Sequence, residues 1–374
     1  MTASLEPRLA SVARDINLLP MTSDPATILP PLFACLETLG LIARHLDPQA
    51  FGEVMAAVGA PDAALRAAYS EFKPSNASDD VGSRLLAASD EALAAFAELR
   101  AALNGGDIRA VFKALRHAPH AQEALYPLAA MIPAVSSFFL DSSLRTDPNA
   151  LARSMQPARE GETGVMHFDN EPRTRGGFSL YVPESYTPDR AWPLVVALHG
   201  GSGHGRGFLW SWLRDARSFG AILVAPTSAG NSLGSTWALM GDGNDTPNLA
   251  RIVAQVSAKW SIDPKRLLLT GMSDGGTFCY VSALDSGSPF THLAPVSATF
   301  HPMLISMADA DRIRGLPIYL VHGALDWMFP VEVARQAKSA LTAAGASVTY
   351  REIDDLSHTY PREINAEMIA WLKA

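Results

Sequence analysis

The sequence predicts an α/β fold: a mostly parallel sheet with helices on both faces, preceded by an all-helical N-terminal domain. Two observations lead to this expectation. From about residue 165 onward, short apolar runs alternate with helix-compatible stretches, the pattern of chains that build parallel sheets. Residues 1–155 contain no obvious strand and are rich in alanine and leucine. We therefore expect a helical accessory domain over residues 1–155 and an α/β domain over residues 156–374.

Composition excludes several classes of protein. The chain is 48% hydrophobic and 18% charged, which is typical of a packed globular protein. Its net charge is −8, with no basic stripe, so we expect no nucleic-acid partner. Cys35 and Cys279 are two isolated cysteines with neither a disulfide framework nor metal-ligand spacing. We expect no metal and no organic cofactor.

The N-terminus lacks the charged-then-apolar pattern of a signal peptide, which favours a cytoplasmic location. The longest uncharged run, residues 124–140, is interrupted by Pro127 and Pro133 and is short for a membrane span. We expect this run to be buried or to cover the active site as a lid, and we expect no membrane span.

The first 155 residues read as a series of helices. Proline pairs or caps mark three expected helix starts, at 30–31, 47–48 and 60–62. The clearest helix covers residues 83–103, and Asp107 is placed to cap the next one over residues 108–117. His45, His117 and His120 are expected to be surface residues rather than ligands. The role of this domain stays open between a lid and a homo-oligomer contact.

The second part alternates strands and helices. Strands are expected at 165–168, 177–182, 194–198, 221–225, 266–270, 293–297, 318–321 and 347–353, and the main helices at 246–260, 277–284, 331–344 and 362–373. The continuous apolar run at 194–198 is typical of a strand covered on both faces.

A G-x-S-x-G motif centred on Ser273 organises this region. It follows the expected strand 266–270 and precedes the expected helix 277–284. A serine at the tip of a sharp strand-to-helix turn is held above the sheet edge, and side chains two residues away would collide with the turn. Gly271 and Gly275 remove those side chains. The motif indicates a nucleophile, because the helix N-terminus behind it favours a developing negative charge.

An acid and a base suited to acyl transfer follow Ser273, in the chain order Ser, Asp, His. Asp326 comes just after the expected strand 318–321, and His358 comes just after the last strand, 347–353. Parallel strands present their carboxyl ends at one edge of a sheet, where open α/β sheets bind ligands. We therefore predict a Ser273–Asp326–His358 triad.

Other residues compete for these roles. Asp354 and Asp355 are rival acids, but they lie on the same loop as His358. His301 is a rival base after the strand 293–297. His322 ends its own strand, so we expect it to hold the turn.

The turn 199–203, His-Gly-Gly-Ser-Gly, follows a buried strand and supplies backbone N–H groups. We predict an oxyanion hole built from the N–H groups of Gly201 and Asp274, the residue after the nucleophile. The alternative, a phosphate-binding glycine loop, fits neither G-x-G-x-x-G nor the Walker A pattern.

These residues resemble the α/β-hydrolase superfamily. Within it they are similar to the phospholipase/carboxylesterase group and to the related polyhydroxybutyrate-depolymerase and feruloyl-esterase-like enzymes. The resemblance covers about residues 165–374 and rests on four segments: His199-Gly200-Gly201, Gly271-Met272-Ser273-Asp274-Gly275, His322-Gly323-Ala324-Leu325-Asp326 and Ser357-His358. The long helical N-terminal region departs from minimal members of that group.

The predicted activity is hydrolysis of carboxylic esters through an acyl-enzyme. A peptidase or amidase would use the same triad and stays open, as does an interaction module built on the helical domain. Trp327, Trp210 and Trp237 are expected to line an apolar pocket, which favours apolar or aromatic esters as small-molecule substrates. Trp210 could instead anchor its helix to the sheet.

Overall fold

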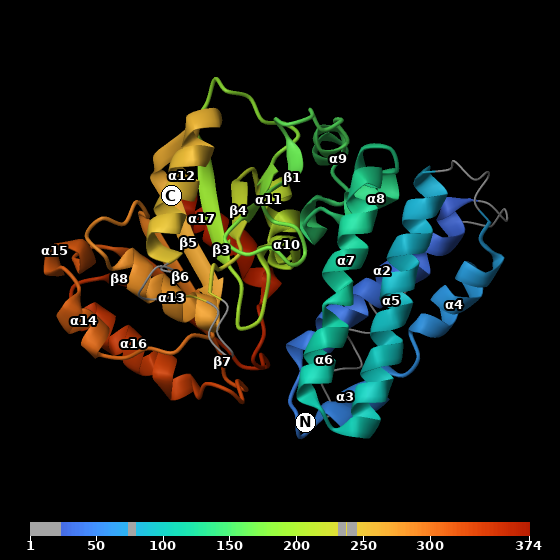
Figure 1. The fold of residues 1–374 in the computed structure, drawn as a ribbon, viewed down its shortest axis with the longest axis horizontal. Coiled ribbons are helices and arrows are strands. Elements are labelled where there is room, and N and C mark those ends of the chain that lie inside the picture. Colours follow the sequence, from blue (N-terminus) through green and yellow to red (C-terminus); the bar gives the residue numbers. More distant parts are fainter. Residues whose placement is uncertain (1–23, 74–79, 231–236, 238–244) are drawn as a thin grey trace. The chain divides into compact units, whose positions relative to one another are not determined.

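A computed structural model describes residues 24–73, 80–230, 237 and 245–374. The chain divides into two compact units, Met1–Phe139 and Leu140–Ala374 (Figure 1), which we call the helical unit and the sheet unit. Residues 140–155, which the sequence placed with the helical domain, belong to the sheet unit in this division. Their helix α9 (Pro148–Ser154) packs on α11 (Leu213–Phe219), and the Asp141 N–H donates to Ser218 Oγ at 2.7 Å.

The helical unit is built from helices joined by short connections. They are α2 (Pro25–Arg44), α3 (Phe51–Val58), α4 (Asp62–Glu71), α5 (Asp80–Gly105), α6 (Ile108–Leu115), α7 (His117–Leu125), the 3-10 helix η2 (Tyr126–Ala130) and α8 (Pro133–Phe138). The Asp107 carboxylate caps α6 by accepting the Arg109 N–H at 2.9 Å, as expected. The long helix expected at 83–103 is α5, which is two or more residues longer at each end.

One expected helix start is wrong. Pro30 and Pro31 lie inside α2, whose first turn instead contains Pro25 and is capped by Asp24. The Asp24 carboxylate accepts the Ala26 N–H at 2.9 Å, so a side-chain cap decides where this helix begins. Within the described residues, α2 is the one helix long and apolar enough to cross a membrane, judged by length and composition alone. It buries Ile28, Leu32 and Leu39 in the core of the helical unit.

The sheet unit contains an eight-stranded mixed sheet in the order β1-β2-β4-β3-β5-β6-β7-β8. The β1–β2 and β2–β4 pairs are antiparallel and all other neighbours are parallel. The strands are β1 (Gly164–Phe168), β2 (Phe178–Val182), β3 (Trp192–Leu198), β4 (Ile222–Pro226), β5 (Ile262–Met272), β6 (His292–Val296), β7 (Pro317–Gly323) and β8 (Ser347–Ile353). The predicted mostly parallel sheet is confirmed.

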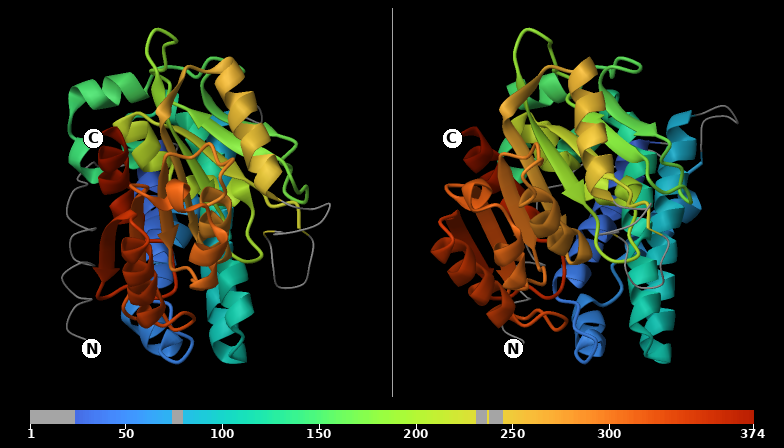
Figure 2. Two further views of the ribbon diagram at one scale, coloured as in Figure 1. Left: turned by 90° about the vertical axis from the view of Figure 1, so that its left-hand side faces the viewer. Right: turned by 60° about the vertical axis from the view of Figure 1, so that its left-hand side comes forward.

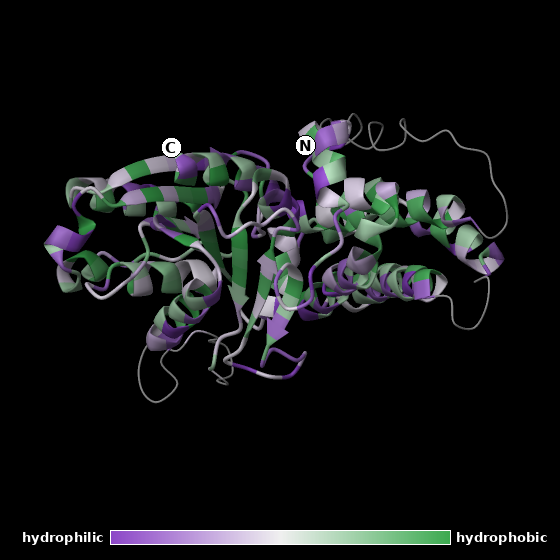
Figure 3. Ribbon diagram, turned by 90° about the horizontal axis from the view of Figure 1, so that it is seen from above, coloured by the Kyte–Doolittle hydropathy of each residue, from purple (hydrophilic) through white to green (hydrophobic). Residues whose placement is uncertain are grey.

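Helices cover both faces of this sheet (Figures 1 and 2): α11 and α17 on one side and α12, α13 and α16 on the other. The remaining bounds are α10 (Gly205–Phe208), α12 (Asp245–Lys259), α13 (Asp274–Ala283), α14 (Met303–Met307), α15 (Ala310–Ile313), α16 (Val331–Ala343) and α17 (Asn365–Lys373). The central strands are hydrophobic over most of their length (Figure 3), and β3 and β4 are buried at every residue. Burial on both faces explains the continuous apolar runs in the sequence.

Candidate active site

Ser273 lies at the turn between β5 and α13. Its backbone has φ 55° and ψ −119°, a conformation that is costly for a residue with a side chain. A Cβ on Gly271 would come within 2.6 Å of the Gly275 backbone, and a Cβ on Gly275 within 2.5 Å of the His199 carbonyl oxygen. The two glycines are therefore required by close backbone approach, which is the steric reason expected from the motif.

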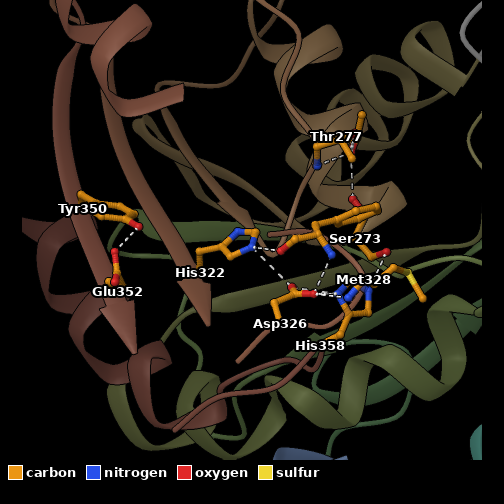
Figure 4. A network of polar contacts seen from close by, with 10 residues as sticks. Ser273, Thr277, His322, Asp326, Met328, Tyr350, Glu352 and His358 are labelled. Atoms are coloured by element: carbon orange, nitrogen blue, oxygen red, sulfur yellow. Dashed lines mark hydrogen bonds and ion pairs between the residues drawn. The ribbon is translucent and has the colours of Figure 1, made fainter. Parts of the chain in front are cut away.

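The structure brings the three predicted triad residues together (Figure 4). His358 Nε2 lies 3.1 Å from Ser273 Oγ, and His358 Nδ1 lies 3.0 and 2.9 Å from the two carboxylate oxygens of Asp326. A carboxylate accepts hydrogen bonds, so Nδ1 carries the proton and Nε2 presents a lone pair to the serine hydroxyl. This is the arrangement in which imidazole can remove the serine proton.

Asp326 is held in its ionised form. Burial opposes ionisation, but the hydrogen bond from His358 and the N–H of Phe329 outweigh it and hold the pKa of Asp326 below its usual value. Asp326 Oδ1 accepts the N–H groups of Met328 at 3.0 Å and Phe329 at 2.8 Å. His322 Nε2 donates to the Phe329 carbonyl oxygen at 2.8 Å, so His322 fixes the acid loop as expected.

The loops that carry the acid and the base cross at Gly323. A Cβ there would lie 2.2 Å from the Leu356 carbonyl oxygen. That same carbonyl accepts the Leu325 N–H at 3.0 Å, and the Ile353 carbonyl accepts the Ala324 N–H at 2.9 Å. These backbone bonds set the separation of Asp326 and His358, and the motif analysis missed this role of Gly323.

The predicted oxyanion residues adjoin the nucleophile. A Cβ on Gly200 would lie 3.4 Å from Ser273 Cβ, and a Cβ on Gly201 would lie 3.0 Å from an Asp274 carboxylate oxygen. Among the described residues, no acceptor pairs with the Gly201 N–H. Asp274 begins α13, where the first N–H groups have no partner within the helix. Gly200, Gly201 and Asp274 thus adjoin Ser273, as predicted for residues of an oxyanion hole.

His199 and Arg175 brace this turn. His199 is buried; its Nδ1 donates to the Gly200 carbonyl at 2.8 Å, and its Nε2 accepts the Ser228 N–H at 3.2 Å. Arg175, from the β1–β2 connection, donates to the carbonyl oxygens of Gly203 at 3.1 Å and Ser228 at 2.9 Å. Sequence reasoning missed Arg175, because nothing in a charged turn indicates that it reaches a glycine loop later in the chain.

Aromatic side chains surround the base. The ring centroids of Phe329 and Trp327 lie 5.2 and 6.1 Å from that of His358. Trp327 is half-buried and keeps an accessible face. Trp210 and Trp237 are 3% and 4% exposed, and Trp237 stacks on Phe278 while its Nε1 donates to the His199 carbonyl. Trp237 thus packs against the glycine turn. Of the three predicted pocket residues, Trp327 has the most solvent-accessible side chain.

The rival residues lie elsewhere. Both close contacts of His358 Nδ1 go to Asp326, while Asp354 is exposed and Asp355 half-buried. His301 is exposed, and its Nδ1 accepts the Met303 N–H at 3.1 Å.

Comparison with known proteins agrees with this geometry. Residues 243–374 match the family model described as phospholipase/carboxylesterase. This match covers the C-terminal part of the sheet unit, and the strand order and the turn at Ser273 agree with it. The chain is also 28% identical over 212 residues to a bifunctional acetylxylan esterase/xylanase from Neocallimastix patriciarum, a match covering 54% of this chain and 29% of that protein. The chain thus matches less than a third of that relative's length.

Solved structures of similar fold include two hydrolases. One is a ferulic acid esterase, with 16% identity, a TM-score of 0.47, and coverage of 56% of this chain and 96% of that one. The other is FphF, a fluorophosphonate-binding serine hydrolase of Staphylococcus aureus, with 16% identity, a TM-score of 0.45, and coverage of 56% and 97%. The resemblance that the motifs predict, to phospholipase/carboxylesterase enzymes, is confirmed by the family match.

Proposed function

We propose that this chain hydrolyses carboxylic esters through an acyl-enzyme formed on Ser273. The observation that carries the proposal is the hydrogen-bonded series Asp326–His358–Ser273, with Nε2 3.1 Å from the hydroxyl oxygen. Ser273 Oγ attacks the ester carbonyl carbon while His358 takes the hydroxyl proton. His358 then gives this proton to the leaving alkoxide, which departs as the alcohol.

Asp326 and the glycine turn stabilise the charges that form during the reaction. The ionised carboxylate holds the imidazole tautomer and stabilises the imidazolium that forms in each half-reaction. The N–H groups of Gly201 and Asp274 receive the negative charge of the tetrahedral intermediate. In the second half-reaction His358 takes a proton from water while the water oxygen attacks the acyl carbon. His358 then returns this proton to Ser273 Oγ as the bond between Oγ and the acyl carbon breaks, so the carboxylic acid leaves and the serine hydroxyl is restored.

We further propose that Trp327 and Phe329 form an apolar wall, which favours esters with an apolar or aromatic group. Both rings lie beside His358, and Trp327 keeps an accessible face, which supports this choice. The acetylxylan esterase relative is named for a substrate with a small acyl group. Hydrolysis of a panel of esters that differ in acyl and alcohol size separates a preference for apolar or aromatic esters from a preference for acetyl esters. Faster hydrolysis of acetyl esters than of aromatic ones would contradict the apolar wall.

The reaction class is tested with matched substrates. We expect the purified chain to hydrolyse a p-nitrophenyl ester much faster than the p-nitroanilide of the same acyl group, and Ser273→Ala to lose this activity while keeping its circular dichroism spectrum. Ser286→Ala, which changes an exposed serine away from the site, is the control and should retain activity. Faster cleavage of the anilide would indicate a peptidase or amidase instead. Ester hydrolysis that survives in Ser273→Ala would contradict the proposal.

A further inference from the structure

The helical unit contains a cluster of histidine and glutamate side chains that the proposed ester chemistry does not use. Helices α5 and α7 pack side by side (Figure 1), and α5 contributes Glu91 while α7 contributes His117 and His120. The spacing His-x-x-His places both imidazoles on one face of α7, one turn apart. One ligand atom from each of the three residues lies within 4.8 Å of the other two.

Two of the three separations between donor atoms lie on either side of the spacing that a metal requires. Glu91 Oε2 lies 2.5 Å from His117 Nδ1 and 3.6 Å from His120 Nδ1. Tetrahedral zinc has bonds of about 2.0–2.2 Å to nitrogen and oxygen, so its ligand atoms are about 3.3 Å apart. The two distances bracket this value, and small side-chain rotations would equalise them.

A second carboxylate orients the first histidine. Glu98, two turns after Glu91 on α5, places Oε1 3.4 Å from His117 Nε2. The Lys113 ammonium holds Glu98 in turn, 3.3 Å from each carboxylate oxygen. A histidine that binds a metal through one nitrogen commonly directs its other N–H to a carboxylate, which fixes the ring. Glu98 therefore leaves His117 Nδ1 facing Glu91 and His120.

We propose that Glu91, His117 and His120 form a binding site for a divalent transition-metal ion such as Zn²⁺, with water in the open positions. Two imidazole nitrogens and one carboxylate suit zinc and its neighbours, whereas Mg²⁺ and Ca²⁺ prefer oxygen ligands. Metal binding requires a neutral imidazole, so the ion takes the Nδ1 lone pair of His117 while its N–H at Nε2 is directed to Glu98.

The site is open to solvent and joins two helices. The side chains of His117, Glu91 and His120 are 21%, 34% and 56% exposed, so an ion can enter without unfolding. A bound ion would cross-link α5 and α7, whose sequence positions are separated by α6. Because it binds only the folded arrangement, the ion should stabilise the helical unit in proportion to its free concentration.

The test uses the full-length chain without a histidine tag, after removal of metals with a chelator. Isothermal titration with ZnCl₂ should give one saturable site per chain, and zinc should raise the unfolding temperature. His120→Gln, at the most exposed of the three positions, should lose this site without disturbing the fold. Glu98→Gln should weaken zinc binding about 10- to 100-fold, as outer-shell changes do. His301→Ala, which removes an exposed histidine of the sheet unit, is the control and should bind as the wild type does.

Two results would overturn the proposal. One is the absence of saturable zinc binding and of any zinc-dependent rise in unfolding temperature in the wild-type chain. The other is equal zinc affinity in the wild type, His120→Gln and His117→Ala, because the ion would then bind elsewhere.

Discussion

Ser273 has a strained backbone, and its hydroxyl oxygen lies within hydrogen-bond distance of His358 Nε2. Its φ of 55° is tolerated because Gly271 and Gly275 let β5, α13 and the end of β3 approach closely. The same turn directs Oγ at His358 Nε2, so steric strain and reactivity come from one local geometry. Asp326 is the proposed acid, and its hydrogen bonds to His358 Nδ1 orient the imidazole.

Asp326→Asn should lower kcat on the order of 10⁴-fold, because an amide no longer fixes the Nδ1–H tautomer of His358. The control is Asp355→Asn on the His358 loop, for which we expect a much smaller effect. Steady-state hydrolysis of a p-nitrophenyl ester measures both variants. A large loss in Asp355→Asn with little loss in Asp326→Asn would reverse the assignment of the acid.

Trp327→Ala should reduce discrimination between a bulky aromatic ester and an acetate ester. A lost apolar contact is worth about 10- to 200-fold in kcat/KM, which sets the scale of the change. Leu325→Ala removes an exposed side chain from the same loop and serves as the control. An unchanged ratio of the two kcat/KM values in Trp327→Ala would remove this residue from the substrate pocket.

At the scale of elements, the site is assembled by connections between strands rather than by the strands alone. The acid and base loops cross where Gly323 meets the Leu356 carbonyl. The glycine turn after β3 is tied to the end of β4 by Arg175, which bridges the carbonyl oxygens of Gly203 and Ser228. We infer that Arg175 is a positioning residue for the proposed oxyanion hole.

Arg175→Met should lower kcat about 10- to 100-fold with little change in KM, because a small displacement of oxyanion donors affects the transition state more than ground-state binding. Arg173→Met, an exposed position in the same turn, should behave as the wild type does. Equal kcat values for the two variants would show that the glycine turn does not depend on Arg175.

At the scale of the whole molecule, a buried carboxyl links stability of the sheet unit to pH. Burial raises the pKa of Asp215 to about 6, against a usual value of 3.8, although a hydrogen bond from Asn365 acts in the opposite direction. Asn365 also accepts the Tyr360 hydroxyl, two residues after His358. A raised acid pKa means that the folded state favours the protonated form. The stability this provides is complete below about pH 3.8 and is lost as pH rises through about 6.

Asp215→Asn should therefore gain stability relative to the wild type as pH rises. The pKa difference corresponds to roughly 3 kcal/mol at full ionisation, so the unfolding free energy of the variant minus that of the wild type should increase by up to this amount between about pH 4 and 7.5. Urea unfolding at several pH values measures the difference. A constant difference across this range would mean that Asp215 has an ordinary pKa.

The sequence predicts most of the sheet unit, because buried parallel strands leave continuous apolar runs and the turn at Ser273 leaves paired glycines. Two kinds of feature escape it. Helix starts depend on side-chain caps, so α2 begins directly after its cap Asp24 rather than at Pro30. Long-range contacts have no local pattern, so neither the reach of Arg175 to Gly203 nor the meeting of Glu91 with His117 could be predicted from spacing alone.

Labelling with a fluorophosphonate tests the central claim most directly, because this reagent reacts with an activated serine and needs no knowledge of the substrate. We expect one phosphonyl group per chain, located by peptide mass spectrometry on Ser273, with complete loss of ester hydrolysis at full labelling. His358→Ala should label far more slowly, since Ser273 then lacks its base. Stoichiometric labelling of another serine, or full activity in the chain labelled at Ser273, would contradict the account.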